Sequence, residues 1–418
     1  MQSLRGTKDI LPDEIHIWQY IYKKANEILT LANYQEIRTP IIENTNLFER
    51  SIGNETDIIN KEMYSFEDQG NRNITLRPEG TASIARAFIS NQLYIEKKLQ
   101  RLWYLGPMFR YERPQYGRQR QFHQLGIECI GSCSPMADVE VIRLAMNTLK
   151  ILQCTQYNLE INSIGDIQER TVYKDKLLEY LIKYKNDLDN DSKKRLDTNP
   201  LRILDSKNRK TQEILTEAPE LHSCLKSNSL KHFNTICENL EYLNIKFNIN
   251  KKLVRGLDYY NYTAFEIKTK EIGKQDTLCG GGRYDKLIEQ LGGPKTPSVG
   301  WAIGMERLII IIKNKIQIRK TETSIYIATQ GDKNKKNIWK VIEIIEDCQI
   351  KFNLDLNNNN LQKQLKKAYQ LNAKICLIIG ENEIINNSII IKYLKTGYQE
   401  KIQMNNLKQY LYSLKNRL

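Results

Sequence analysis

The sequence predicts an α+β protein with a helical insertion and a separate α/β domain at its C-terminal end. Residues 103–130 contain two strand-like runs joined by a polar loop, which indicates an antiparallel hairpin. Residues 166–250 are charged and helical in pattern, without glycine-rich turns or strand alternation. From residue 324 onward strand-like and helical segments alternate, as they do in small α/β domains.

The order of elements along the chain predicts its division into domains. A helix begins at Pro12, where apolar residues such as Trp18 recur at helical spacing. Strand-like and glycine-rich character returns at residues 253–312, and residues 313–323 form a polar, basic linker. Because 418 residues suffice for about two to three domains, we expect a core of residues 1–165 and 251–320, an insertion of 166–250 and a C-terminal domain of 321–418.

Composition narrows the function classes. The chain has 63 Lys and Arg against 49 Asp and Glu residues, a formal charge of +14, which favours a polyanionic partner such as RNA or a phosphorylated substrate. No apolar run of about 18 residues or more occurs, so the sequence predicts no membrane span. The eight Cys stand singly, without a paired Cys-x-x-Cys spacing, so we expect reduced thiols and no metal held by the protein.

Polar side chains share one face of the predicted hairpin. Side chains two apart point to the same face of a strand. The first strand therefore brings Arg110 and Glu112 together, and the second strand aligns Phe122, Gln124 and Glu128. A solvated sheet face would show the same pattern, so parity alone leaves a site and a solvated face both open.

A turn before a predicted helix places Glu79 beside Thr81. The Glu79 carboxylate could hold an ammonium group at this turn. Thr81 could instead cap the helix, and neither interpretation excludes the other. His123 alternates with apolar neighbours on the far face of its strand, so we expect a packed core histidine and not a catalytic base.

Three glycine-containing segments carry the remaining candidates. Arg255 stands beside a glycine and shortly before Tyr259 and Tyr260, so a cation could approach a phosphate while the hydroxyls contact a polar ring. Residues 279–284 predict a flexible glycine loop that lacks the dinucleotide and P-loop spacings. Arg307 falls in the first turn of a predicted helix, where it suits an arriving anion. The alternatives are a plain turn at Arg255, an ordinary turn at residues 279–284 and a surface arginine at Arg307.

Taken together, these segments closely resemble bacterial-type histidyl-tRNA synthetases, a family of class II aminoacyl-tRNA synthetases. Residues 36–40 resemble motif 1, residues 109–126 motif 2 and residues 304–307 motif 3, which many class II enzymes share. Residues 255–260 and 280–285 resemble the two signatures specific to histidine enzymes. The resemblance covers nearly the whole chain. It implies a six-stranded antiparallel sheet with flanking helices and a C-terminal α/β anticodon-binding domain.

The resemblance also implies a reaction, the ATP-dependent ligation of L-histidine to the 3′ end of its tRNA through a histidyl-adenylate. Arg110 would contact the α-phosphate of ATP and Glu112 the adenine edge, with adenine stacked between Phe122 and Arg307. Arg255 and Arg110 would be catalytic, because they would stabilise negative charge at the α-phosphate. The implied histidine-binding residues are Glu79, Thr81, Gln124, Glu128, Arg255, Tyr259, Tyr260 and Tyr284.

The implied partners are ATP with Mg²⁺, L-histidine, the histidine tRNA and a second copy of the chain. No membrane or DNA partner is expected. The basic loop between the two predicted strands could touch the tRNA acceptor end, although such a loop can also be merely solvated. Its candidate residues are Arg113, Arg118 and Arg120.

One alternative is a non-catalytic relative that acts as the regulatory subunit of an ATP phosphoribosyltransferase. It would share the core fold without the catalytic set, whereas this chain keeps Arg110, Arg255 and Arg307. Heavy use of Asn, Lys and Ile fits an AT-rich genome, and the first nine residues resemble neither a signal peptide nor a transit leader. We therefore expect a cytoplasmic protein, or one of the plastid stroma if it is encoded in the organelle.

Overall fold

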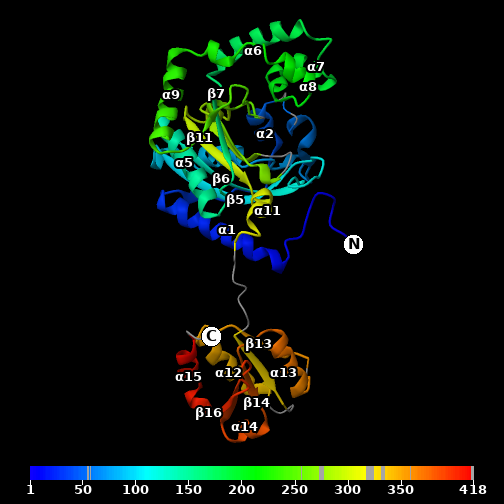
Figure 1. Cartoon of the computed structure of the whole chain (residues 1–418), viewed down its shortest axis with the longest axis vertical. Helices are drawn as coiled ribbons and strands as arrows, with labels where there is room; N and C mark the ends of the chain where they lie inside the picture. Colours follow the sequence, from blue (N-terminus) through cyan, green and yellow to red (C-terminus); the bar gives the residue numbers. More distant parts are fainter. Residues whose placement is uncertain are drawn as a thin grey trace. The chain divides into compact units, whose positions relative to one another are not determined.

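The computed structural model describes residues 1–53, 56, 58–255, 257–272, 277–316, 324–330, 335–357 and 359–415. The chain divides into two compact units, Met1–Ile318 and Arg319–Leu418, which are described separately here (Figure 1). The expected domain boundary between residues 320 and 321 lies outside the described residues.

A large sheet lies at the centre of the first unit, with strand order β1-β5-β6-β11-β10-β9-β7-β8. The run from β5 to β7 in this order is antiparallel throughout, which confirms the expected six-stranded antiparallel sheet. The short strands β1 and β8 extend it at the two edges in parallel pairing. The strands are β1 (Gln35–Glu36), β5 (Gln100–Phe109), β6 (Gln121–Ile130), β7 (Asn158–Ser163), β8 (Asn248–Ile249), β9 (Asn261–Lys268), β10 (Thr277–Arg283) and β11 (Ser298–Gly304).

The predicted hairpin is strands β5 and β6, which pair from Gln100 opposite Ile130 to Phe109 opposite Gln121. Residues 110–120 form the loop between them, so Arg110 and Glu112, predicted to lie on the first strand, instead come just after its end. Met108 of the hairpin joins a smaller apolar cluster on one face of the sheet, whereas Trp103 is buried in the main core on the other face.

Helices cover that face, and their apolar residues form one cluster with the strands (Figure 1). The first helix begins at Pro12 as predicted and buries Trp18. The covering helices are α1 (Pro12–Leu31), α5 (Pro135–Ile151), α9 (Ser227–Tyr242) and α11 (Met305–Ile312). The opposite face of the sheet carries a second apolar cluster, to which Tyr104 and Met108 belong, and beside it the polar side chains of a cavity.

The glycine-rich segment at 279–284 is wrongly predicted as a flexible loop, because it runs along strand β10 inside the sheet. A side chain at Gly281 would overlap the Phe265 ring and the Gly300 carbonyl. A side chain at Gly280 would overlap the Arg255 guanidinium. The glycines therefore let the neighbouring strands and the Arg255 side chain approach β10 closely. A flexible loop that leads into a helix would not need such close contacts.

Shorter elements stand beside the cavity, including a three-stranded antiparallel sheet of order β2-β4-β3. On one face of this sheet, Leu76 of the central strand opposes Ile42 on one side and Tyr64 on the other, and Ile74 opposes Phe66. The elements are β2 (Ile42–Asn44), α2 (Thr45–Ile52), a π-helical turn (Ile58–Glu62), β3 (Tyr64–Glu67), β4 (Asn73–Leu76), α3 (Thr81–Ser90), α4 (Leu93–Glu96), a 3₁₀ turn (Lys270–Ile272) and α10 (Leu287–Gln290).

The helical insertion has a small core of its own, which includes Tyr173, Leu177 and Leu204. Its elements are α6 (Ile167–Ile182), α7 (Asn190–Asp197), a 3₁₀ turn (Pro200–Asp205), α8 (Arg209–Ile214) and a second 3₁₀ turn (Leu221–Cys224). Helix α9 and strand β8, which the predicted range 166–250 also includes, behave differently. Phe233 of α9 packs into the main core and β8 pairs with β7. The division into domains therefore stays a proposal, and the insertion as a packing unit is shorter at its C-terminal end.

The second unit has a mixed sheet of order β13-β12-β14-β15-β16, with parallel pairing among β13, β12 and β14. Its helices and strands alternate as predicted. They are β12 (Ile325–Thr329), α12 (Lys335–Asp347), β13 (Phe352–Leu354), α13 (Leu361–Gln370), β14 (Ile375–Ile379), α14 (Glu381–Ile385), β15 (Ser388–Tyr393), β16 (Gln399–Gln403), a 3₁₀ turn (Met404–Asn406) and α15 (Leu407–Leu414).

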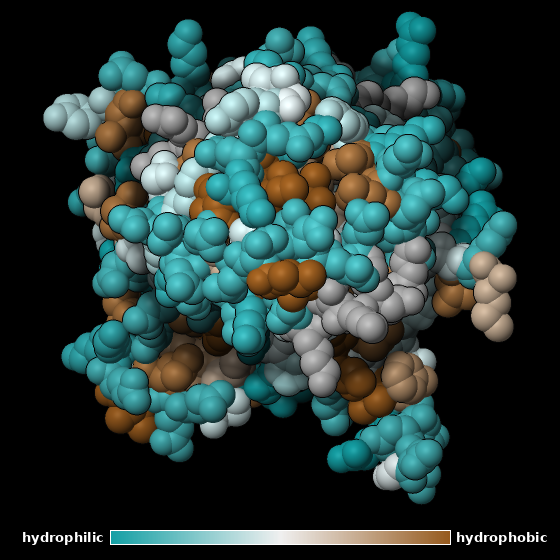
Figure 2. All heavy atoms as spheres, turned by 90° about the horizontal axis from the view of Figure 1, so that it is seen from below, coloured by the Kyte–Doolittle hydropathy of each residue, from teal (hydrophilic) through white to brown (hydrophobic). Residues whose placement is uncertain are grey.

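The molecular face in Figure 2 is largely hydrophilic, and its hydrophobic side chains stand in small separate groups. In the described part of the chain, no helix has both the length and the apolar character needed to cross a bilayer.

Candidate active site

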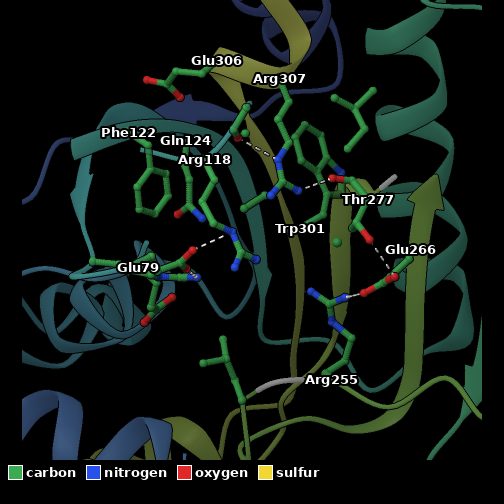
Figure 3. A pocket seen from close by; sticks show the side chains of 18 of the residues that line it. Glu79, Arg118, Phe122, Gln124, Arg255, Glu266, Thr277, Trp301, Glu306 and Arg307 are labelled. Atoms are coloured by element: carbon green, nitrogen blue, oxygen red, sulfur yellow. Dashed lines mark hydrogen bonds and ion pairs between the residues drawn. The ribbon is translucent and has the colours of Figure 1, made fainter. Parts of the chain in front are cut away.

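A cavity of about 700 Å³ lies on the polar face of the large sheet (Figure 3). Strands β5, β6, β9, β10 and β11 contribute to it, together with the turn before α3 and the loop that follows β8. Most of the predicted site residues meet here although they are far apart in sequence. Those that line the cavity are Glu79, Thr81, Arg110, Glu112, Arg118, Phe122, Gln124, Arg255, Tyr259, Tyr260 and Arg307.

Glu79 stands at the break between β4 and α3. Its carboxylate accepts the backbone N–H groups of Thr81 and Ala82, each at 2.7 Å. Glu79 therefore supplies the acceptor for the first turn of α3, and the capping role considered for Thr81 is wrong. Burial raises the pKa of Glu79, while the two N–H groups favour its ionised form. A buried carboxylate fixed in this way is suited to an ammonium group.

Arg110 and Glu112 follow the end of β5. Arg110 Nε donates to the Pro78 carbonyl at 2.9 Å, and the guanidinium carbon lies 5.3 Å from the centroid of the Phe122 ring. Glu112 Oε2 lies 2.6 Å from Arg118 Nε, and Glu112 Oε1 lies 3.9 Å from Arg110 Nη1. Two cations, a carboxylate and an aromatic ring therefore border the same part of the cavity. Such a set can bind a phosphate and a purine.

Arg307 enters the cavity from α11, and Figure 3 shows it and Phe122 on different sides of the open space. Arg307 Nε donates to the Gly117 carbonyl at 3.0 Å, and Nη1 donates to the Thr277 carbonyl. These carbonyls hold the plane of the guanidinium while leaving its face beside the cavity. A flat ring between Phe122 and Arg307 would meet a π-system on one side and a cation on the other.

Arg255 reaches the cavity from the loop after β8, and Figure 3 shows it next to Glu266. Arg255 Nη1 donates to Glu266 Oε1, and Thr277 Oγ1 donates to Glu266 Oε2 at 3.1 Å. Burial opposes the charge of Arg255, but the Glu266 carboxylate outweighs it and raises the pKa of the guanidinium. The arginine is thus a half-buried, oriented cation, and the absence of a side chain at Gly280 leaves room for it.

Several buried polar atoms around the cavity have no hydrogen-bond partner in the described part of the chain. They are Gln124 Oε1, Tyr104 Oη and Arg255 Nε. Buried polar atoms are nearly always paired in folded proteins, since an unpaired one costs about 1–3 kcal/mol. Their position at the cavity therefore indicates that a polar ligand completes their hydrogen bonding.

Glu128 and Tyr284, which the resemblance assigns to histidine binding, are fully buried and do not line the cavity. Thr81 Oγ1 donates to Glu128 Oε1 at 2.7 Å, and Tyr284 Oη donates to Glu128 Oε2. Burial raises the pKa of Glu128 to about 8, against the effect of these two hydroxyls. Of the two hydroxyl donors only Thr81 borders the cavity, so Oε1 is the oxygen of Glu128 nearest to a ligand.

The three arginines assigned to the tRNA acceptor end have different surroundings. Arg118 lines the cavity beside Glu112. Arg120 lies over the Tyr111 ring, with its guanidinium carbon 3.8 Å from the ring centroid, and its Nε donates to the Glu112 carbonyl at 3.3 Å. Arg113 is exposed. Arg113 therefore remains the clearest candidate for contact with RNA, while Arg118 is better placed to contact a ligand in the cavity.

His123 lies on the opposite face from Gln124, as expected, and it is half-buried. Its Nδ1 is 2.9 Å from Glu306 Oε1, and its ring packs edge-on against Trp18 with 4.8 Å between centroids. The histidine links β6 to α1 and α11, which agrees with a structural role.

Sequence reasoning assigned no role to several residues that border the cavity, among them Tyr104, Glu266, Trp301 and Lys207. Tyr104 falls on the same sheet face as Arg110 and Gln124 by strand parity, but parity alone gave it no role. Glu266 and Trp301 lie inside strands without any local motif, and Lys207 comes from the insertion. Only the pairing of distant strands brings them to the site.

Comparisons with known proteins agree with this geometry. Residues 6–308 match the family model described as histidyl-tRNA synthetase, and residues 309–414 match that of an anticodon binding domain. The chain is 62% identical to the chloroplastic histidine–tRNA ligase of Gracilaria tenuistipitata var. liui, over all of this chain and 99% of the relative. It is 49% identical to the histidine–tRNA ligase of Rippkaea orientalis, over all of this chain and 97% of that protein.

Among solved structures, the apo histidyl-tRNA synthetase of S. aureus is similar, with a TM-score of 0.82 and 35% sequence identity over 99% of this chain and all of that one. Both family models together account for nearly the whole sequence, and the relatives match from end to end. The chain therefore belongs to the histidyl-tRNA synthetase family.

Proposed function

We propose that the cavity binds L-histidine and ATP, joins them as histidyl-adenylate, and then passes the histidyl group to the 3′ end of the histidine tRNA. One observation carries this proposal: a single cavity combines buried, fixed carboxylate and hydroxyl groups with the three arginines Arg110, Arg255 and Arg307. The acidic and polar groups suit an amino acid, and the arginines suit a triphosphate.

The histidine end is formed by the turn before α3 and the loop before β9. Glu79 would hold the α-amino group with Thr81, and Gln124 would bind near the carboxylate. The Tyr259 and Tyr260 rings pack against each other at a tilt of 44°, with 4.7 Å between centroids, and would contact the imidazole. Glu128 would bind the imidazole through Oε1, which accepts the Thr81 hydroxyl and can accept a second donor, since each carboxylate oxygen has two lone pairs.

The ATP end is formed by the motif 2 loop and α11. Adenine would stack between Phe122 and Arg307, with its edge at Glu112. Arg110 would contact the α-phosphate. Arg118 lies 2.6 Å from Glu112 and lines the same cavity, so we assign it to ATP in preference to tRNA.

The chemistry follows from these positions. The histidine carboxylate attacks the α-phosphorus, the bond from that phosphorus to the bridging oxygen breaks, and pyrophosphate leaves with the electron pair. Negative charge builds at the α-phosphate, so fixed cations such as Arg110 and Arg255 are the expected catalysts, and no protein nucleophile is needed. The hydrogen-bonding groups of the histidine end would favour an imidazole over an apolar side chain, because an apolar side chain would leave these buried polar atoms unpaired.

Mg²⁺ would accompany ATP and neutralise the pyrophosphate as it leaves. Within the described residues, no cluster of three or more His, Cys, Asp or Glu side chains could hold a resident metal. Because the described residues hold no such cluster, the cavity suits a cation that keeps several of its waters and is bound mainly by phosphate oxygens, as Mg²⁺ is with nucleotides. Glu266 and Glu112 are cavity carboxylates that could add a ligand or hold such a water.

The test is pyrophosphate exchange with each amino acid in turn. We expect exchange that depends on histidine and on Mg²⁺, because the polar pocket selects an imidazole and the nucleotide needs a cation. A chelator that removes zinc but binds Mg²⁺ weakly should leave the rate unchanged. Exchange with another amino acid would overturn the assignment, and loss of activity with that chelator would contradict the metal argument.

The net positive charge would supply the salt-dependent part of tRNA affinity. The regulatory-subunit alternative is not supported, since the full-length relatives named above are ligases and the arginines are present. The Gracilaria relative is named a chloroplastic protein, which favours the plastid over the cytoplasm as the place of action.

We further propose a homodimer, joined at least partly through the three-stranded sheet that follows the motif 1 segment. Ile42 is 51% exposed and Phe66 is 47% exposed on one face of that sheet. A contiguous uncovered apolar face commonly marks an interface. Ile41, which is 40% exposed, stands directly before this strand and next to residues 36–40.

Light scattering at micromolar concentration should give twice the mass of the chain. Phe66→Asp should shift the mass toward the monomer, because it places a charge in the buried interface. Tyr242→Asp, at an exposed aromatic residue of α9, is the matched control and should stay dimeric. A monomeric mass for the unaltered protein would exclude the dimer, and a dimeric Phe66→Asp would exclude this face as the interface.

A further inference from the structure

The loop between β8 and β9 carries Arg255, Tyr259 and Tyr260 to the cavity. Its described residues, 250–255 and 257–260, belong to no helix or strand. Irregular backbone must find its hydrogen-bond partners elsewhere, and side chains that do chemistry need a fixed backbone. What holds this loop therefore bears on the reaction.

The loop is held from behind by Arg170 of α6. Arg170 Nη1 donates to the Tyr260 carbonyl at 2.8 Å, and Nη2 donates to the Asp258 carbonyl at 3.0 Å. One planar guanidinium thus bridges two carbonyls of the loop, while the tyrosines of the same stretch point to the cavity. Burial lowers the pKa of Arg170, opposed by the charge of Asp258.

The start of α6 is itself fixed. Asp166 Oδ1 accepts the Glu169 N–H at 2.8 Å, and Glu169 Oε2 accepts the Asp166 N–H at 2.7 Å, which is a capping box. Glu169 Oε2 also accepts the Ser229 hydroxyl of α9 at 2.7 Å. Arg170 therefore extends from an anchored turn of helix and is not a mobile surface arginine.

Two residues after Tyr260, where the loop ends, the backbone is strained. Tyr262 has φ of +48°, a left-handed conformation that is costly for a bulky side chain. Its N–H donates to the Gly165 carbonyl and its carbonyl accepts the Ile164 N–H, each at 2.7 Å. Gly165 and Ile164 immediately precede α6. Such strain persists only where the surroundings determine the backbone firmly, and here the segment leading into α6 does so.

The insertion also packs directly behind the loop. Between the insertion and the loop lies a small cavity of about 30 Å³, which has room for about one water. Its walls include Asn199, Leu201 and Leu221 from the insertion and Val254 and Leu257 from the loop. Asn199 Nδ2 lies 3.4 Å from Asp258 Oδ1.

We propose that Arg170 is a positioning residue for adenylate formation. It ties the first helix of the insertion to the backbone that presents Arg255, Tyr259 and Tyr260. The insertion thereby sets the geometry of the histidine end of the cavity. This inference rests on the proposed function.

Arg170→Ala is the test, with rates of adenylate formation expressed per active site after titration of active sites. We expect the per-site rate to fall about 10-fold and the KM for histidine to rise by a similar factor, since a misplacement of about 1 Å can cost roughly 10²-fold. The KM for ATP should change less, because its proposed ground-state contacts come from the loop after β5, from β6 and from α11, while Arg255 is expected to act mainly as charge develops at the α-phosphate. Arg170→Lys should recover part of the loss, since an ammonium can bond a carbonyl without the planar fork.

Arg195→Ala is the matched control. Arg195 is another half-buried arginine of the insertion, and its Nη1 donates to the Arg202 carbonyl at 3.1 Å, within the insertion. Its per-site rate and histidine KM should stay near those of the unaltered protein. If Arg170→Ala lost active sites but kept both values at the remaining ones, its role would be structural only and the inference would be wrong. Equal effects of both variants would also overturn it. Lack of histidine-dependent exchange in the unaltered protein would instead refute the proposed function.

Discussion

Arg255→Ala should lower the single-turnover rate of adenylate formation by about 10²–10³-fold, the usual loss for one preorganised group that stabilises transition-state charge. Arg255 is half-buried and held by Glu266, so it can meet the α-phosphate without reorganising as charge develops. Histidine affinity, measured separately by calorimetry, should change far less. Arg255→Lys should restore the rate only partly, because an ammonium cannot match two phosphate oxygens at once.

An exposed arginine provides the control for this variant. Arg72, with a side chain that is 75% exposed, pairs with Asp68 on the surface, so Arg72→Ala should leave both the rate and the histidine affinity unchanged. Should Arg255→Ala lose histidine affinity but keep its single-turnover rate, Arg255 would be only a wall of the pocket. Glu266→Gln gives a second check, since it loosens Arg255 without removing the cation and should cause a smaller loss of rate.

The fold was largely predictable because it depends on local patterns. The helix at Pro12, the hairpin of β5 and β6 and the alternating C-terminal unit follow from apolar spacing and turn residues. Two errors have a common cause. The 279–284 glycines serve contacts with Phe265 and Arg255, and α9 packs on the main core, so both depend on partners distant in the sequence.

The site was predictable where a motif or strand parity marks a residue, as for Gln124 and Glu79. Strand parity placed Glu128 on the same sheet face as the site. Parity does not show how deeply a side chain is buried, and Glu128 is fully buried behind Thr81. Glu266 and Arg170 escaped prediction because each acts on Arg255 or on its loop from an element without a local signal. Their roles follow only from tertiary packing.

Glu128→Ala should have the opposite kinetic effect to Arg255→Ala. We expect histidine affinity to fall by about 10²-fold, while the single-turnover rate at saturating histidine and ATP changes much less. The reason is that a buried partner of the imidazole is lost, and an unsatisfied buried group costs about 1–3 kcal/mol. Calorimetry of histidine binding and single-turnover adenylate formation, measured on the same preparation, separate the two effects.

Tyr284→Phe is the matched control, because it removes the donor to the far oxygen of Glu128 and leaves Oε1 beside Thr81 unchanged. If the imidazole takes Oε1, Tyr284→Phe should lower the thermal midpoint of unfolding but cost much less histidine affinity than Glu128→Ala. Glu128→Gln keeps acceptor and donor atoms for both hydroxyls but cannot ionise, so at a pH above the Glu128 pKa of about 8 its histidine affinity should fall between the two. Unchanged histidine affinity in Glu128→Ala would mean that the carboxylate only supports Thr81 and Tyr284, and that the tyrosines of the 255–260 loop recognise the imidazole alone.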